Sequence, residues 1–235
     1  MKDFLKISDL IIENNNQYII ANKPAGMPCV PDKTGDKNLK NYLEAYSKHD
    51  LYIITRIDRP ISGITIYAKS AKAATAITNQ LKNRTVKKIY WAIVEGKPNK
   101  SDGILEDYVI KTRSNKAVVV DKSHEEAKLA NLEYKTLVTY DNYTGLEVGL
   151  ITGRFHQIRV QMANNGCIIK GDVKYGARRK NNDRSIHLHS YSISFLHPVS
   201  EEQMSYAAIP SKEDSLWKIM TTNIHDTTKG KSEEE

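Results

Sequence analysis

The residues of this chain best suited to do chemistry lie between positions 55 and 69, where Asp58 stands between Arg56 and Arg59. Nearby positive charge favours the ionised form of a carboxyl group, so Asp58 is predicted to stay charged. An ionised aspartate that is held on a defined turn can act as a nucleophile or as a base. Structural ion pairs share this appearance, so these residues alone favour a surface ion cluster between two strands over a catalytic site.

Five segments of the chain together resemble the RluA-type RNA pseudouridine synthases, and they occur in the order in which that family carries them. The segment at 55–69 resembles the family motif His-Arg-Leu-Asp-x-x-Thr-Ser-Gly-Leu, which holds its catalytic aspartate. The resemblance covers about residues 9–210. The matching segments are NKPAGM (22–27), TRIDRPISGITIYAK (55–69), KIYWAIVEG (88–96), TGRFHQIRV (152–160, followed by Gly171-Asp172 and Tyr175-Gly176), and HLH with FLHP (187–189 and 195–198).

The resemblance implies that the chain isomerises a uridine of RNA to pseudouridine. In this reaction the C1′–N1 glycosidic bond breaks, the base turns over, and the base rejoins the ribose through C5. The resemblance makes Asp58 the catalytic carboxylate, and it leaves open whether Asp58 adds to the sugar or base or removes a ribose proton. No redox change or outside energy is needed, so no cofactor is expected.

Two further residues are assigned to catalysis by the resemblance. Arg159 matches the arginine that pairs with the catalytic carboxylate, and a bidentate guanidinium would hold that carboxylate in one rotamer. Tyr90 matches the active-site tyrosine, and a phenol beside the uracil could stack on it and relay the C5 proton. The structural alternatives are an arginine on an exposed helix face and a tyrosine of the core.

Six residues are predicted to contact RNA or to line the active site. In the family the position of Arg56 helps to prise the target nucleotide from its stack, a step that a uridine inside a stem requires. Lys87 and Lys88 belong to a basic patch that is either an RNA surface or a solvated helix end. Lys23 is either a phosphate contact or a solvated turn lysine. The predicted RNA-binding residues are Lys23, Arg56, Lys87, Lys88, Arg154 and His156.

Several positions depart from the family pattern. Thr55 and Gln161 each replace a histidine, Phe155 occupies a Thr or Ser position, and residues 167–170 replace a His-Pro-Ile-Val type of stretch. None of these changes touches the three predicted catalytic residues. They therefore bear on which RNA is modified more than on which reaction occurs.

The composition fits a basic protein of the cytoplasm. The formal net charge is +7 and the pI about 9.2, which suits a polyanionic partner such as rRNA or tRNA, although a merely soluble basic protein would show the same. The sequence has no apolar run long enough for a membrane span and no signal-peptide core. Cys29 and Cys167 lack metal-ligand spacing. We expect a cytoplasmic monomer that binds RNA and no membrane.

A metal site is not expected either. His187 and His189 alternate along one predicted strand face and could mimic a pair of ligands. No third ligand follows at a suitable spacing, so a zinc site is rejected.

The elements that must position these residues are mostly strands. Leu39, Leu43 and Tyr46 lie on one apolar stripe of a predicted helix, and Ser70 is predicted to cap a second helix. Strands dominate from 89 to 152, and a helix is expected over 157–165. This pattern predicts an α+β fold with a large mixed, mainly antiparallel sheet and flanking helices. The resemblance adds a central catalytic cleft.

One catalytic domain is expected over residues 1–220, followed by a disordered tail over 221–235, which is polar and charged. The small RNA-binding domain that often precedes the family's catalytic domain is not expected, because about eight residues precede the resemblance. Two functions remain open. The first is an active RNA pseudouridine synthase, and the second is a catalytically inactive RNA-binding protein of the same fold. A sugar hydrolase is disfavoured, because it needs two carboxylates and only Asp58 lies in a matching motif.

Overall fold

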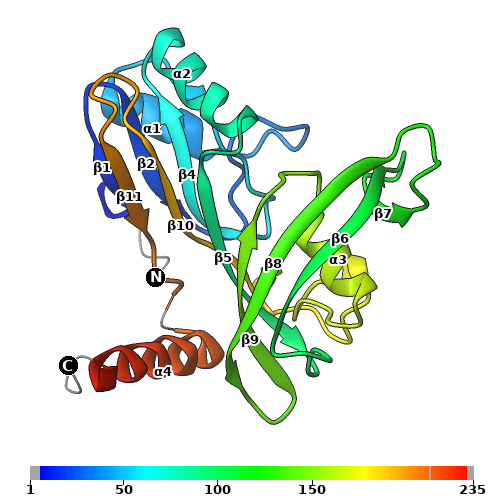
Figure 1. The fold of residues 1–235 in the computed structure, drawn as a ribbon. Helices are drawn as coiled ribbons and strands as arrows, with labels where there is room; N and C mark the ends of the chain where they lie inside the picture. The colour runs from blue at the N-terminus through cyan, green and yellow to red at the C-terminus, as the bar shows by residue number, and fades with distance from the viewer. Residues whose placement is uncertain (1–5, 212, 232–235) are drawn as a thin grey trace. The chain divides into compact units, whose positions relative to one another are not determined.

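The computed structural model of the chain describes residues 6–211 and 213–231, and side chains as far as residue 224 (Figure 1). The chain divides into two compact units. The first comprises Met1–Ile89, Asn182–Ser185 and His189–Ala208, and the second comprises Tyr90–Asn181, Ile186–Leu188 and Ile209–Glu235. No helix in the described part of the chain is both long and apolar enough to cross a membrane.

The first unit is built on strands in the order β1-β2-β4-β10, with β11 paired to β10 and the short β3 paired to β4. All of its described pairings are antiparallel except that of β10 with β4, which makes the sheet mixed. Its strands are β1 (Ile11–Asn14), β2 (Tyr18–Lys23), β3 (Tyr52–Ile53), β4 (Ser62–Ala68), β10 (Leu188–Leu196) and β11 (Gln203–Ala207). Its helices are η1 (Ile7–Leu10), α1 (Leu39–Ser47) and α2 (Ala71–Lys82).

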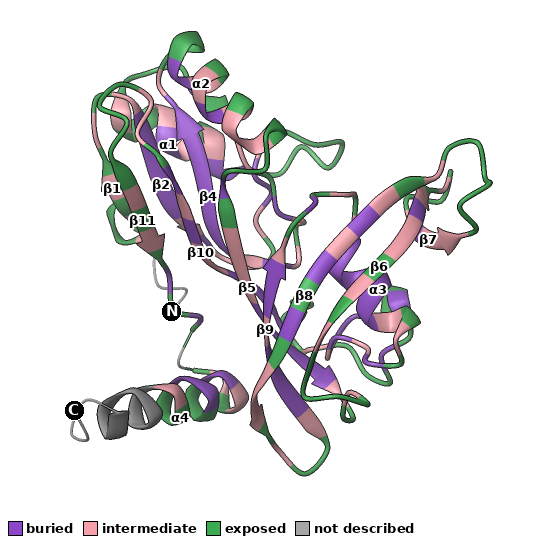
Figure 2. Ribbon diagram, in the orientation of Figure 1, coloured by how far each residue is buried: buried purple, intermediate pink, exposed green. Residues whose placement is uncertain are grey.

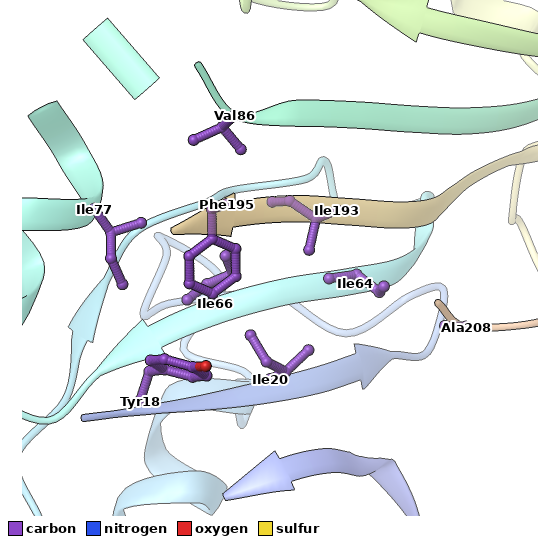
Figure 3. Packing of buried hydrophobic residues seen from close by; sticks show 9 residues of the cluster. All are labelled: Tyr18, Ile20, Ile64, Ile66, Ile77, Val86, Ile193, Phe195 and Ala208. Atoms are coloured by element: carbon purple, nitrogen blue, oxygen red, sulfur yellow. The ribbon is translucent and has the colours of Figure 1, made fainter. Parts of the chain in front are cut away.

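Strands β2 and β4 are buried on both faces, as Figure 2 shows. Successive side chains of a strand point to opposite faces. Tyr18 and Ile20 of β2 therefore pack in one cluster with Ile77 of α2 (Figure 3), whereas Ile19 packs in another with Leu43 of α1. The predicted cap at Ser70 is confirmed, since its side chain accepts the N–H of Ala73, and Asn38 caps α1 in the same way by accepting the N–H of Asn41. Capping of this kind satisfies N–H groups that lack a partner in the first turn.

The second unit carries a sheet in the order β5-β9-β8-β6-β7. Strand β5 begins in the first unit and enters the second at Tyr90. Val109 and Ala130 of the sheet, Val160 of the first helix after it and Tyr175 form one buried cluster of this unit. The strands are β5 (Lys87–Glu95), β6 (Asp102–Lys111), β7 (Ala117–Val120), β8 (Lys128–Thr139) and β9 (Tyr143–Leu150), and the helices are α3 (Gln157–Asn164), η2 (Val173–Tyr175) and α4 (Ser215–Lys231).

The α+β class and the large, mixed, mainly antiparallel sheet are confirmed. The boundary between domain and tail is wrong, because α4 continues through Lys231 and residues 221–231 are helical. The helix starts where Asp214 accepts the N–H groups of Leu216 and Trp217, and it keeps Met220 and Thr221 buried. The last residues of the predicted tail, 232–235, lie outside the described residues. That residues 1–220 act as one catalytic domain stays a prediction.

Candidate active site

Asp58 lies in the first unit, on the turn that joins β3 to β4. Its carbonyl oxygen accepts the N–H of Ile61 at 3.0 Å, which closes the turn. Along the turn the side chains alternate, since Arg56 is exposed, Ile57 is buried and Asp58 is half-buried. The buried isoleucine anchors the turn to the core, so the Asp58 carboxylate is held at a defined place near the surface.

Gly63 lets β4 begin immediately after this turn. It has a φ of +114°, and a Cβ atom at this position would lie 2.3 Å from the backbone oxygen of Ser190. Ser190 lies on β10, which runs parallel to β4 at this point. Only glycine tolerates both the backbone angle and the close approach. The Ser-Gly pair after Asp58 thus fixes where the turn meets the sheet.

The two arginines that flank Asp58 in the sequence differ in role. Arg59 forms two hydrogen bonds with Gly26: the Gly26 N–H donates to the Arg59 carbonyl at 2.7 Å, and the Arg59 side-chain Nε donates to the Gly26 carbonyl at 2.8 Å. Its Nη2 forms an ion pair with Asp36, and this contact lowers the pKa of that carboxyl group. The expectation of a structural ion cluster is therefore correct for Arg59. Arg56 remains available at the surface.

Lys23 does not contact the solvent, and its prediction as an RNA-binding residue is wrong. Its side chain is 0 % exposed, and Nζ donates to the carbonyl oxygens of Pro24 at 2.9 Å, Met27 at 2.8 Å and Arg59 at 3.3 Å. Burial lowers the pKa of Lys23 to about 8, while Cys29 and Asp58 act in the opposite direction. An ammonium group with three carbonyl partners ties the NKPAGM segment to the turn that carries Asp58. It has no donor directed at a phosphate.

In the second unit, residues 152–160 form a tight turn that leads into α3. The side-chain oxygen of Gln157 accepts hydrogen bonds from the Thr152 hydroxyl at 2.8 Å and from the Arg154 backbone N–H at 2.9 Å. Its amide nitrogen donates to the Asn131 carbonyl at 3.1 Å. The Arg154 Nε donates to the carbonyl of Leu129 at 2.9 Å. Gln157 therefore organises the turn, a role that the sequence analysis missed.

Arg159 is buried and forms a bidentate ion pair with Asp172. Its Nε lies 2.7 Å from Oδ2 and its Nη2 lies 2.8 Å from Oδ1, and the two side chains are 5% and 2% exposed. The guanidinium also lies over the Tyr175 ring, 5.1 Å from its centroid. This fork fixes the orientation of the guanidinium. The sequence analysis singled out Gly171-Asp172 as a motif but gave Asp172 no role, and the role of Arg159 toward Asp58 stays a prediction.

His156 adopts a left-handed backbone conformation with a φ of +52° at the start of α3. Its Nδ1 lies 2.8 Å from the Tyr175 hydroxyl, and its ring stacks on Phe155 at a centroid distance of 3.9 Å. Half-buried, it lies at the edge of this turn.

The remaining predicted residues lie along β5. Tyr90 is half-buried, ahead of a fully buried run from Trp91 to Val94. Lys87 is exposed and Lys88 is half-buried, and burial lowers the pKa of Lys88. Lys87 is therefore accessible to an RNA at the surface, whereas Lys88 is only partly accessible.

The two histidines that could mimic metal ligands have protein partners. The Nδ1 of His189 lies 2.8 Å from the Ser62 hydroxyl and its Nε2 lies 2.8 Å from the Ala208 carbonyl, and burial lowers its pKa to about 4. His187 pairs with Asp214 at 3.1 Å and stacks on Trp217. Both therefore serve the packing of their own units.

The sequence model of one family, described as RNA pseudouridylate synthase, matches residues 17–164. The chain belongs to the RNA pseudouridylate synthase family. An uncharacterized RNA pseudouridine synthase of Zymomonas mobilis is 30% identical over 198 residues, which cover 83% of this chain and 90% of that protein. Ribosomal large subunit pseudouridine synthase C of Rickettsia conorii is 32% identical over 172 residues, or 72% of this chain. The chain spans 57% of the length of that relative.

Solved structures agree with this family in fold. The structure of human RNA pseudouridylate synthase domain containing 1 superposes with a TM-score of 0.74 and 19% identity, covering 93% of this chain and 90% of that chain. That of human RNA pseudouridylate synthase domain containing 4 superposes with a TM-score of 0.73 and 21% identity, with 93% and 94% covered. The pseudouridine synthase fold expected from the five segments is therefore confirmed.

Proposed function

We propose that this member of the pseudouridylate synthase family isomerises a specific uridine in structured rRNA or tRNA, with Asp58 as its catalytic carboxylate. The observation that carries the proposal is the construction of the Asp58 turn. A buried lysine, an arginine that binds Gly26 and Asp36, and an obligatory glycine all serve to hold one half-buried carboxylate near the surface. Rigid placement of a single ionisable group is what a reaction at one ribose requires.

Asp58 would attack the sugar or base, or remove a ribose proton, so that the C1′–N1 bond breaks and the base is released for rotation. Tyr90 would stack on the uracil and relay the proton that leaves C5 when the new C1′–C5 bond forms. Arg159 would hold the Asp58 carboxylate. Its fork to Asp172 supports this role, because a guanidinium that is already oriented loses little freedom when it acts.

RNA would be bound by the basic surface residues. Arg56 is exposed two residues from Asp58, which suits a side chain that takes the place of an extruded uridine. Lys87, Lys88, Arg154 and His156 would contact the backbone or the walls of the site. The proposed enzyme works as a monomer in the cytoplasm and needs neither a cofactor nor a metal.

The test compares Asp58→Asn with the wild-type chain. Asparagine keeps the shape of the side chain but loses the anion, so turnover should fall by about a hundredfold or more, while RNA binding changes little. The matched control is Asp50→Asn, because Asp50 is an exposed aspartate outside the site. Turnover is measured as tritium released from RNA whose uridines are labelled at C5, since the new C–C bond displaces that hydrogen.

The RNA is identified by pseudouridine mapping of total RNA from cells with and without the gene. Loss of one pseudouridine together with loss of tritium release in Asp58→Asn supports the proposal. An Asp58→Asn variant that retains more than a few per cent of turnover refutes the catalytic assignment. RNA binding without any turnover in the wild-type chain would favour a catalytically inactive RNA-binding protein.

A further inference from the structure

Phe155 is an exposed aromatic residue at the turn before α3. Its side chain is 37% exposed, although phenylalanine usually lies in the core. One face of its ring rests on the imidazole of His156, with the centroids 3.9 Å apart and the planes at 18°. Phe155 and His156 therefore form a small flat stack at the surface of the second unit.

The stack is held rigidly from below. The Nδ1 of His156 lies 2.8 Å from the hydroxyl of Tyr175, and the two rings meet edge to face. The Tyr175 hydroxyl also accepts the backbone N–H of Ala117 at 2.8 Å. Tyr175 and Ala117 both belong to the buried cluster of the second unit. A chain of contacts thus leads from the core to Phe155 and fixes the orientation of its ring.

The surroundings of the stack are positively charged. The ammonium of Lys111 lies over the Phe155 ring at 4.6 Å from its centroid, and that of Lys116 lies 5.2 Å from the centroid of Tyr175. Because the imidazole already occupies one face of Phe155, Lys111 approaches the other face. Lys111 is exposed, and so is Arg113 in the turn between β6 and β7. A flat aromatic surface beside exposed cations matches the requirements of a single-stranded nucleic acid.

We propose that the outer face of Phe155, backed by His156, stacks on one unpaired base of the RNA that this chain modifies, while Lys111 pairs with a neighbouring phosphate. The proposal rests on the proposed function for the identity of the RNA. Stacking on an aromatic side chain strengthens binding by roughly fivefold to a hundredfold. The exposed cation–π contact that Lys111 gives up contributes only about two- to fivefold. Replacing the Lys111 ammonium by a base on the Phe155 ring therefore strengthens binding. The Lys111 charge then pairs with the neighbouring phosphate.

The experiment uses the full chain and a short single-stranded oligouridine that carries one 5-bromouridine, whose irradiation cross-links it to an aromatic ring in stacking contact. Binding is measured by fluorescence anisotropy, and the cross-linked peptide is identified by mass spectrometry. The variants are Phe155→Leu, which keeps an apolar side chain without π-electrons, and Phe155→Tyr, which restores the ring. The matched control is Tyr46→Leu, because Tyr46 is 49% exposed on α1 in the first unit.

In the wild-type chain the cross-link is expected at residues 155–156. Phe155→Leu should weaken binding by about fivefold or more and lose the cross-link, and Phe155→Tyr should recover both. Tyr46→Leu should bind within about twofold of wild type, as a surface change outside the site does. Melting curves of all three variants should coincide with that of wild type, which separates lost stacking from lost structure.

The outcomes separate this inference from the proposed function. Turnover in the wild-type chain without a cross-link at residues 155–156, or unchanged affinity in Phe155→Leu, overturns the stacking role and leaves the proposed function standing. A cross-link that depends on the Phe155 ring in a chain without turnover supports the stacking role and refutes the catalytic proposal. Absence of both binding and turnover overturns both. A cross-link outside residues 155–156, together with a loss of affinity in Tyr46→Leu but not in Phe155→Leu, also overturns the stacking role.

Discussion

The buried pair of Arg159 and Asp172 provides the sharpest test of the structure. The change is Asp172→Asn, which keeps the size of the side chain and removes its charge. Both partners are almost fully buried, with side chains 5% and 2% exposed. The variant would therefore leave the guanidinium inside the protein without the carboxylate that its Nε and Nη2 atoms contact.

The expected cost follows from the environment of the pair. Breaking a buried ion pair by removing one partner costs about 3–5 kcal/mol, because the remaining charge stays desolvated. A domain is stable by about 5–15 kcal/mol, so roughly a fifth of the stability or more is at stake. For a chain of this size each kcal/mol lowers the melting temperature by about 2–4 °C, which predicts a decrease of about 6–20 °C.

The measurement is equilibrium unfolding in urea, with a thermal melt as a second probe. Asp50→Asn is the control, because the same chemical change at an exposed position should alter the free energy of unfolding by less than about 0.5 kcal/mol. A cost below about 1 kcal/mol for Asp172→Asn would refute the description of the pair as buried and mutually dependent.

A double variant separates charge burial from lost hydrogen bonds. Arg159→Met combined with Asp172→Leu removes both charges and keeps apolar volume, so it should be more stable than either single charge removal. If the double variant lost as much free energy of unfolding as the two single variants lose together, this reasoning would be contradicted. The predicted loss of stability also limits tests of catalysis. The activity of an Arg159 variant reports on the proposed pairing with Asp58 only at temperatures where the variant is folded.

Two further predictions concern the Asp58 turn. Burial lowers the pKa of Lys23 to about 8 in the folded protein, from the usual 10.5 of an exposed lysine. Between about pH 8 and pH 10.5 Lys23 is therefore protonated in the unfolded chain but not in the folded protein. The free energy of unfolding, measured relative to Lys23→Met, should rise by about 3 kcal/mol as the pH increases across this range. Urea titrations across this range measure the difference, and a flat profile would contradict the burial of the ammonium. Gly63→Ala should cost more than about 3 kcal/mol or prevent folding, because its Cβ would meet the Ser190 backbone at 2.3 Å. Gly35→Ala, with a positive φ but open space, should cost only about 1–2 kcal/mol in the same assay.

Features that depend only on neighbouring residues could be predicted from the amino-acid sequence. The cap at Ser70 and the apolar stripe of α1 could be predicted because capping and helical periodicity act within one or two turns of chain. The position of Asp58 between two strands could be predicted for the same reason. The family could be identified because five short motifs occur in order, and a match to residues 17–164 bears this out.

Tertiary structure decided the roles of individual charges. Lys23 and Lys87 look alike in the sequence, yet the first is wholly buried and the second is exposed. Desolvation depends on everything that packs around a group, and that information is spread over the whole chain. Lys23 binds the carbonyl of Arg59, a residue 36 positions away. Asp172 was likewise recognised only as part of a motif, because its partner Arg159 approaches it through the fold of the second unit.

The length of α4 is a second feature that local sequence could not predict. The polar composition of residues 221–235 favours disorder when the segment is considered alone. The helix nevertheless continues to Lys231, since Asp214 caps its start and residues such as Met220 and Thr221 are buried. Helix formation is cooperative, so a nucleus that tertiary contacts stabilise extends into residues that would not form a helix alone. Local pattern thus decided where the elements begin, and packing decided how far they extend and which charges they bury.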